Sequence, residues 1–342
     1  MPVTEAAAEV RIQPGQSIQD ALDACAPGAV LRLAEGAYEG SLVIGRPDVA
    51  LVGAGAGRTV IVPGPVAPTA VPPLHDAPAG VVSGITAHGV SGVRVEGLTV
   101  RGFSGAGVYA HTATDLRLVD VESVANKVWG LYVRESSKVE VLRCRAEGSQ
   151  YGGIALAFCS AADALIADCE ATANAFGVFV DNSSRARVVR NRSHGNAAGV
   201  LLLHQTYEGE LPGGVADVLV ADNDITGNTL ASGGDDPDAP GFAGPPISGV
   251  GIGAIGVRRV AVVGNRLHGN APGGPSVMGA ALVLGSSAEW GGSDSVDNSF
   301  EWNTITGNTP FDVQLGTDPG NQRFRNNVVG SSQPEAIDGC GP

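Results

Sequence analysis

A short sequence unit recurs along this chain, and it restricts the fold more than any other feature. The segment VLVADNDITGN, which ends at Asn228, matches RVAVVGNRLHGN, ARVVRNRSHGN and SFEWNTITGN, and weaker copies precede them. The aligned copies share two columns, five residues apart. The first column is Leu98, Val121, Cys144, Cys169, Asn191, Asn223, Asn265 and Asn303, and the second is Asn126, Ser149, Asn174, Asn196, Asn228, Asn270 and Asn308. Self-similarity of this kind indicates a solenoid.

Each copy is expected to carry two short strands. One precedes the first column, and the other follows a glycine, as in GVYA, GLYV, GIAL, GVFV, GVLLL, GVGIG and GAALVL. Strands this short pair with the same strand of the next copy, which makes parallel sheets along the solenoid axis. Stacked asparagines then hydrogen-bond to one another and to the turn backbone. We therefore predict an all-β, single-stranded right-handed parallel β-helix of about ten coils.

One domain is expected to span residues 1–342, with a cap at 1–35, coils at 36–330 and a tail at 331–342. The segment SIQDALDACAPG predicts a short capping helix, because Ser17 is a helix-capping residue type and a Pro-Gly stop follows the apolar positions. Longer coils place loop insertions at 205–214, 230–247, 271–277 and 286–297. Such insertions often gather around a binding face.

Composition supports this fold and excludes some partners. Glycine accounts for 50 residues and aromatic residues for only 5%, which is typical of many short strands and tight turns. The net charge of −14 disfavours nucleic acid and anionic membranes as partners. The first residues resemble no signal peptide, so we expect a cytoplasmic protein, or a secreted one whose leader has been removed. The oligomeric state is left open. Five cysteines match no zinc pattern, so we expect reduced thiols, with Cys144 and Cys169 stacked in the core.

Two stretches carry a family resemblance. VRIQPGQSIQDALDACAPGAVLRLAEGAYEGSLVI resembles the capping segment of the pectin-lyase-like superfamily. The later units NRSHGN and GVFVDNSS resemble repeats of mannuronan epimerases and NosD-like proteins. The resemblance covers nearly the whole chain, and it implies polysaccharide lyases, epimerases and hydrolases as the commonest relatives. Many chemistries share this scaffold, so activity has to be argued from the site.

Side chains of the glycine-initiated strands alternate between core and surface. The residue after each glycine should point inward, and the next should point outward. The two outward columns are predicted to be Tyr109, Tyr132, Ala155, Phe179, Leu201, Gly251 and Ala281, then His111, Arg134, Ala157, Asp181, Leu203, Gly253 and Val283. Neighbouring coils lie about 4.8 Å apart, so these residues should form one surface patch.

The patch provides the candidate site. The catalytic candidates are Tyr109, His111, Tyr132, Arg134, Asp181 and His204. Proton abstraction beside a carboxylate needs a base, for which we consider His111 or Tyr132, and a cation such as Arg134 to steady an enolate-like intermediate. Phe179, Leu201, Leu203, Ala155 and Ala157 are the substrate-binding candidates.

Plainer interpretations stay open for several of these residues. The two tyrosines can be a surface ladder, Arg134 can pair with Glu135 or Asp181, and Asp181 can cap a turn. His194 and His268 fall in turns and are interpreted as structural.

No cofactor is expected. The segment Asp235-Asp236-Pro237-Asp238 resembles a D-P-x-D signature of alginate epimerases, but it lies in a Pro/Gly loop and is interpreted as coincidence; calcium binding there is weakly specified. We predict a cofactor-independent acid–base enzyme of the lyase or epimerase type acting on a carbohydrate. One alternative is an intracellular isomerase or cyclase for a small, partly apolar metabolite, because Arg134 is the only cation on the outward columns. The other is a non-catalytic β-helix that binds a glycan or a protein.

Overall fold

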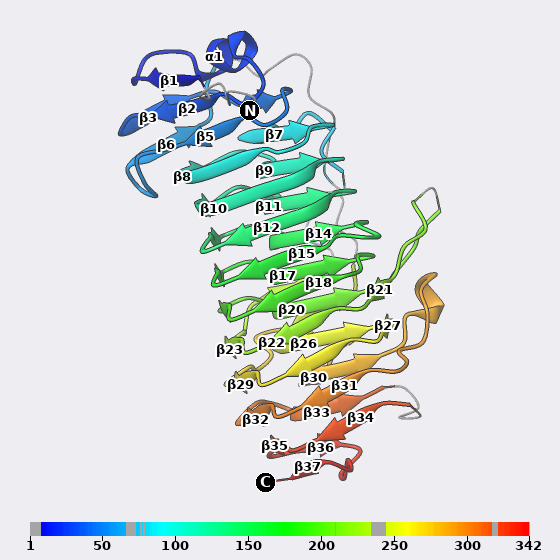
Figure 1. The fold of residues 1–342 in the computed structure, drawn as a ribbon. Helices are drawn as coiled ribbons and strands as arrows, with labels where there is room; N and C mark the ends of the chain where they lie inside the picture. The colour runs from blue at the N-terminus through cyan, green and yellow to red at the C-terminus, as the bar shows by residue number, and fades with distance from the viewer. Residues whose placement is uncertain are drawn as a thin grey trace.

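The computed structural model describes residues 8–65, 73–75, 77, 79–208, 210–233, 244–316 and 321–341, and these form one long stack of coils (Figure 1). The helix α1 (Ile18–Ala24) lies across the N-terminal end of the stack, and the two ends of the chain lie at opposite ends of it. Ser17 caps the helix, because its Oγ accepts a hydrogen bond of 3.1 Å from the backbone N–H of Asp20. The predicted capping helix is therefore present.

The glycine-initiated strands form one parallel sheet, called sheet B here. Its strands follow the order of the sequence: β4 (Leu42–Ile44), β7 (Ile85–His88), β9 (Ala106–His111), β11 (Trp129–Arg134), β14 (Gly152–Ala157), β17 (Phe176–Asp181), β20 (Ala198–Leu203), β26 (Val250–Ile255), β30 (Ala280–Gly285), β33 (Phe311–Leu315) and β36 (Ser332–Gln333).

The remaining coil strands form a second parallel sheet, sheet A, in two runs. The run before the first repeat column is β1 (Glu9–Ile12), β2 (Val30–Leu33), β5 (Ala50–Val52), β8 (Arg94–Arg101), β10 (Thr114–Val124), β12 (Ser137–Leu142), β15 (Ala164–Ala167), β18 (Ala186–Val189), β22 (Leu219–Ala221), β28 (Ala261–Val263), β31 (Ser299–Glu301) and β34 (Arg323–Arg325). The run after it is β3 (Gly36–Glu39), β6 (Thr59–Val62), β13 (Arg145–Glu147), β16 (Glu170–Thr172), β19 (Arg192–His194), β23 (Asp224–Thr226), β29 (Arg266–His268), β32 (Thr304–Thr306), β35 (Asn327–Val329) and β37 (Cys340–Gly341).

A typical coil thus has three strands, whereas the sequence predicted two. In most coils the residue of the first repeat column separates the two strands of sheet A. Strands β8 and β10 instead continue through that residue, and they join the two runs into one sheet. Two short pairs of strands lie at the loops: β21 (Val215–Ala216) pairs with β27 (Val257–Arg258), and β24 (Ala231–Ser232) pairs with β25 (Ile247–Ser248). The 3₁₀ turn η1 (Ala288–Trp290) follows β30 in the chain.

The core runs along the inside of the stack. The inward residues Val108, Leu131, Ile154, Val178 and Val200 are each at most 1% exposed and belong to one continuous apolar cluster. Parallel strands joined coil by coil around such a core are a right-handed parallel β-helix, as predicted.

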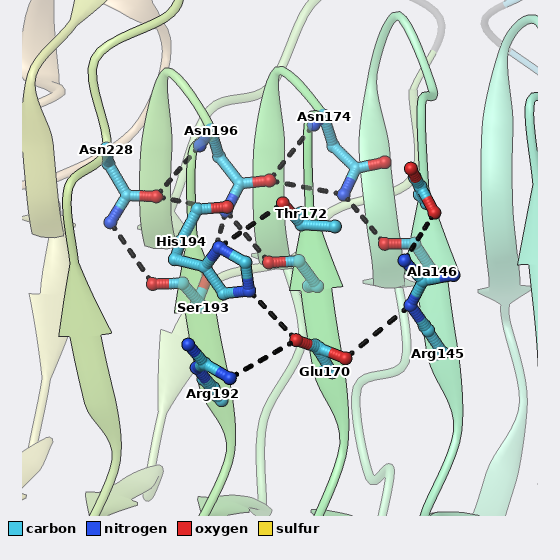
Figure 2. A network of polar contacts seen from close by, with 12 residues as sticks. Arg145, Ala146, Glu170, Thr172, Asn174, Arg192, Ser193, His194, Asn196 and Asn228 are labelled. Carbon is cyan, nitrogen blue, oxygen red and sulfur yellow. Dashed lines mark hydrogen bonds and ion pairs between the residues drawn. The ribbon is translucent and has the colours of Figure 1, made fainter.

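Two asparagine ladders satisfy the buried turns. Figure 2 shows one of them: the backbone N–H of Asn174 donates to Oδ1 of Asn196 at 3.0 Å, and the N–H of Asn196 donates to Oδ1 of Asn228 at 3.0 Å. The second ladder joins Asn191, Asn223, Asn265, Asn303 and Asn327 in the same way. Where the two columns hold asparagine, they form hydrogen-bond ladders between coils, as predicted.

The cysteines behave as core residues. All five are free, and the backbone N–H of Cys144 donates to Sγ of Cys169 at 3.4 Å, so these thiols continue the asparagine column. Burial raises the pKa of Cys144 well above its usual value, and burial raises the pKa of Cys159 to about 11. These thiols are packed and protonated at neutral pH.

One part of the predicted register is wrong. The structure pairs Leu201 with Gly253 and Leu203 with Ile255, so the outward columns continue through Gly253 and Val283, and not through Gly251 and Ala281. The segment SGVGIG contains three glycines, and the strand register makes Gly251 the counterpart of Gly199. A side chain is excluded at this position, since a Cβ added to Gly251 would lie 2.7 Å from the Ala281 carbonyl oxygen.

Candidate functional site

The outer face of sheet B holds the predicted site residues. Tyr109 pairs with Tyr132, and their rings stack with centroids 5.5 Å apart. In the next column His111 pairs with Arg134, Arg134 with Ala157, and Ala157 with Asp181. The strand register therefore confirms that these residues are neighbours on adjacent strands.

Much of this face is buried, however, and the prediction of an open patch is wrong. Tyr109 and Tyr132 are 1% and 0% exposed, and Arg134 and Asp181 are also buried. The wall residues pack in the same way: Phe179, Leu201, Ala155 and Ala157 are buried and Leu203 is half-buried. They belong to a second apolar cluster outside the solenoid, to which Leu74, Ile247 and Met278 contribute from outside the strands of sheet B. The repeat pattern carries no information on how these segments pack, so it left the face exposed.

Four accessible groups gather at the N-terminal end of this face. We call His75, His88, His111 and Glu135 the histidine cluster. The ring of His111 lies 5.2 Å from that of His75 and 5.0 Å from that of His88, between ring centroids. Nε2 of His111 lies 3.5 Å from Oε1 of Glu135. His75 and His88 are exposed, and the side chains of His111 and Glu135 are 14% and 24% exposed.

A buried guanidinium supports the cluster. Nε of Arg134 donates to Oε1 of Glu135 at 3.0 Å, and Nη1 donates to the Tyr132 hydroxyl at 3.4 Å. The guanidinium also lies 4.2 Å from the centre of the Phe158 ring, which favours a cation–π contact. One of the predicted alternatives, an ion pair between Arg134 and Glu135, is therefore present.

The electrostatics keep the central imidazole neutral. Burial is the largest effect and lowers the pKa of His111, the charge of Glu135 opposes this, and the charges of His75 and His88 lower the pKa further. A neutral imidazole can accept a proton or bind a metal ion. Among the described residues, His75, His111 and Glu135 form a group whose ligand atoms all lie within 4.8 Å of one another.

Two predicted site residues lie apart from the cluster. Asp181 is three strands from His111 in the same column, which corresponds to about 14 Å. His204 lies beyond the end of β20, where Nδ1 is 3.0 Å from the Ser293 hydroxyl and burial lowers its pKa. His194 and His268 were predicted to lie in turns, but they are the last residues of strands β19 and β29. Nε2 of His194 lies 2.9 Å from Oε1 of Glu170 (Figure 2), and Nδ1 of His268 lies 2.7 Å from the Thr306 carbonyl oxygen.

Sequence reasoning missed three members of the cluster. His88 could have been found from the repeat, because β7 pairs with β9 and places His88 in the same column as His111. Glu135 was considered only as an ion-pair partner, and it directly follows a strand end. His75 had no signal, since it lies outside the repeats. The segment Asp235–Asp238 lies outside the described residues.

A second concave surface lies on sheet A. It is an open hollow of about 600 Å³ lined by Asp163, Arg185, Arg187, Asp217 and Arg259 together with apolar residues. Four of these charged groups already pair, Arg185 with Asp163 and Arg259 with Asp217. The histidine cluster therefore remains the better candidate site.

Comparisons with known proteins agree on the fold. The model of the family described as "Right handed beta helix region" matches residues 83–236. The A-modules of two Azotobacter vinelandii mannuronan C-5 epimerases resemble the chain with TM-scores of 0.64 and 0.58 at 18% identity, covering 94% and 95% of this chain and 89% and 90% of theirs. The catalytic domain of an α-1,3-glucanase gives a TM-score of 0.62 at 14% identity, covering 100% of this chain and 66% of that one.

No curated protein matches the sequence significantly. The part of the chain that the structure describes contains no helix with the length and hydrophobicity of a membrane span.

Proposed function

Because the chain has the right-handed parallel β-helix of the pectin-lyase-like fold, we propose that it is a carbohydrate-active enzyme of the lyase or epimerase type, working at the histidine cluster. The observation that carries the proposal is the convergence of His88, His111 and the Arg134–Glu135 pair at one accessible end of sheet B. Neighbouring structures titled as mannuronan epimerases, a pectate lyase and an α-1,3-glucanase support a carbohydrate substrate.

The chemistry of the cluster fits proton abstraction next to a carboxylate. The proton would pass from the sugar carbon to an imidazole, for which the exposed His88 and the partly exposed His111 are placed. The negative charge left on the substrate would be stabilised by the nearby guanidinium of Arg134, whose burial reduces screening by water. An epimerase then returns a proton to the opposite face, whereas a lyase expels the glycosidic oxygen.

The test is turnover by the intact protein on alginate and pectate, with α-1,3-glucan, which has no carboxylate beside the abstracted proton, as the negative control. Absorbance of unsaturated products reports a lyase, and deuterium uptake from D₂O at the sugar carbon reports an epimerase. We expect activity on one polymer, and His88→Ala should lower kcat by about 10²-fold or more. His268→Ala is the matched control, because it removes an exposed imidazole far along the stack.

Absence of both turnover and exchange on alginate and on pectate would contradict the proposal. Binding of a polymer without turnover would instead support a non-catalytic module. If His88→Ala and His111→Ala both keep the kcat of the unmodified protein, the reaction takes place elsewhere.

A further inference from the structure

The histidine cluster has the donor set of a metal site. We propose that His75, His111 and Glu135 bind one divalent transition-metal ion, for which Zn²⁺ is the best match. Their ligand atoms lie within 4.8 Å of one another. Two imidazoles and one carboxylate are the protein ligands of zinc sites that keep one coordination position open. The inference concerns the same surface as the proposed function, but it does not depend on a particular substrate or reaction.

The distances suit a small tetrahedral ion. Zinc bonds to nitrogen and oxygen are about 2.0–2.2 Å long, so two ligands of a tetrahedron lie about 3.4 Å apart. Nε2 of His111 and Oε1 of Glu135 lie 3.5 Å apart, which is close to such an edge. The third ligand comes from an exposed side chain, His75, whose imidazole can approach by rotation about its side-chain bonds. Only one ligand therefore has to move appreciably.

His111 also has an electron pair that the protein does not use. Its Nδ1 is buried without a hydrogen-bond partner, and its Nε2 faces a carboxylate oxygen, which is an acceptor. A neutral imidazole carries one N–H and one lone pair. If the proton is on Nε2, the lone pair of Nδ1 meets no described donor; if it is on Nδ1, the lone pair of Nε2 points at the Glu135 carboxylate, which cannot donate to it. A cation between Nε2 and Glu135 would satisfy that second arrangement.

Arg134 acts as a positioning residue for the carboxylate ligand. Its Nε donates to Oε1 of Glu135 at 3.0 Å, and the Phe158 ring holds the guanidinium from one face. Metal-binding carboxylates commonly have such a hydrogen-bonded outer partner. Because Arg134 neutralises Glu135, a bound dication would keep its positive charge, and its open position would take water or an anionic group. Imidazole ligands also select against Ca²⁺ and Mg²⁺, which prefer oxygen.

The test measures ion binding on the full chain, produced without a polyhistidine tag and stripped with a chelator. Calorimetric titration with Zn²⁺ should show one equivalent bound with a micromolar or smaller Kd. His75→Ala and Glu135→Gln should each weaken binding by at least about tenfold. His268→Ala should bind like the unmodified protein. Co²⁺ should give the intense visible bands of a tetrahedral site in the unmodified protein, and both variants should lose them.

Unchanged Zn²⁺ affinity in both variants, or no binding by the folded unmodified protein, overturns the proposal. Circular dichroism verifies folding of each protein, and His75 is exposed, so its replacement leaves the buried face intact. Competition by Ca²⁺ at equal concentration would also contradict an imidazole site. Zinc binding without carbohydrate turnover would leave this site standing while refuting the proposed function, and turnover by the metal-free protein without zinc binding would do the reverse.

Discussion

At the scale of single residues, the buried polar side chains explain why the coils stack in one register. Asn228 is fully buried, and its Oδ1 accepts from both the backbone N–H and the side-chain amide of Asn196. Its own amide donates to the Ser193 carbonyl oxygen and to Oδ1 of Asn270. One side chain thus serves three coils, and its removal leaves buried groups of its neighbours unpaired.

Asn228→Ala should therefore destabilise the protein by about 2–4 kcal/mol, because the buried N–H and the side-chain amide of Asn196 lose their acceptor. Urea unfolding followed by circular dichroism measures the change. Thr229→Ala, at the exposed next position, is the control and should change stability by less than about 0.5 kcal/mol. Equal unfolding midpoints for the two variants would mean that the ladder contributes no more than a surface side chain.

At the scale of elements, two turns repeat a left-handed backbone conformation with alternating charge. One column contains Asp115, Lys138, Asp163, Arg185, Asp217 and Arg259, and the other contains Asp120, Arg143, Asp168, Arg190 and Asp222, all with φ between 43° and 59°. Consecutive coils pair through these groups, for example Arg190 with Asp168 and Arg259 with Asp217, each at 2.7 Å. Because charge alternates along each column, a pairing that skipped one coil would bring like charges together, so the pairs favour stacking of consecutive coils.

These pairs predict a stability loss in acid. Hydrogen bonds from Arg190 and Arg259 are the largest effects that lower the pKa values of Asp168 and Asp217. In the unfolded chain an aspartate has a pKa of about 3.9, so the contribution is complete above that pH and is lost as the pH falls through the lower folded-state values. The side chains are half-exposed, so each pair contributes less than about 1 kcal/mol.

An Asp168→Asn, Asp217→Asn double variant should have a lower Tm at pH 7 and a smaller fall in Tm on acidification below pH 4, because asparagine keeps the left-handed turn but cannot be protonated. Differential scanning calorimetry across this range measures both values. Glu289→Gln, an exposed carboxylate in the turn η1, is the control and should follow the unmodified protein. If the double variant loses as much Tm in acid as the unmodified protein, other groups cause the acid sensitivity.

The elements also show which features a sequence can predict. Strands, ladders and the inward positions follow from the repeat, because each residue is fixed by its equivalents one coil away. The same reasoning fails at Gly251, where several glycines fit the pattern, and only pairing with Ala198–Leu203 decides among them. The two columns of alternating charge were not predicted, because they lie in turns and the repeat was recognised from its apolar and asparagine positions. His75 and the burial of Tyr132 depend on segments packing across sheet B, which no repeat specifies.

At the scale of the whole molecule, the free energy of local unfolding is expected to vary along the axis of the stack. Each coil contacts chiefly the coils before and after it, so opening from the ends leaves the middle folded. The five free cysteines lie at different points along this axis. Cys25 lies at the capped end, Cys340 lies in the last strand, and the middle coils contain Cys144, Cys159 and Cys169. Only Cys340 is partly exposed. A gradient of opening free energy along the stack should therefore appear in the reactivity of these thiols.

Pulsed labelling with a thiol reagent near pH 8 should modify Cys340 first, Cys25 next and the three central thiols last. Burial raises the pKa of Cys144 and raises that of Cys159 to about 11, so these two thiols react only when their coils open, and Cys169 is buried beside Cys144. Peptide mass spectrometry after increasing pulse times gives the order, and labelling in denaturant, where all five should react alike, is the control. A single common rate for all five cysteines in the native protein would show that the coils open together, and the molecule would then unfold as one cooperative unit despite its linear architecture.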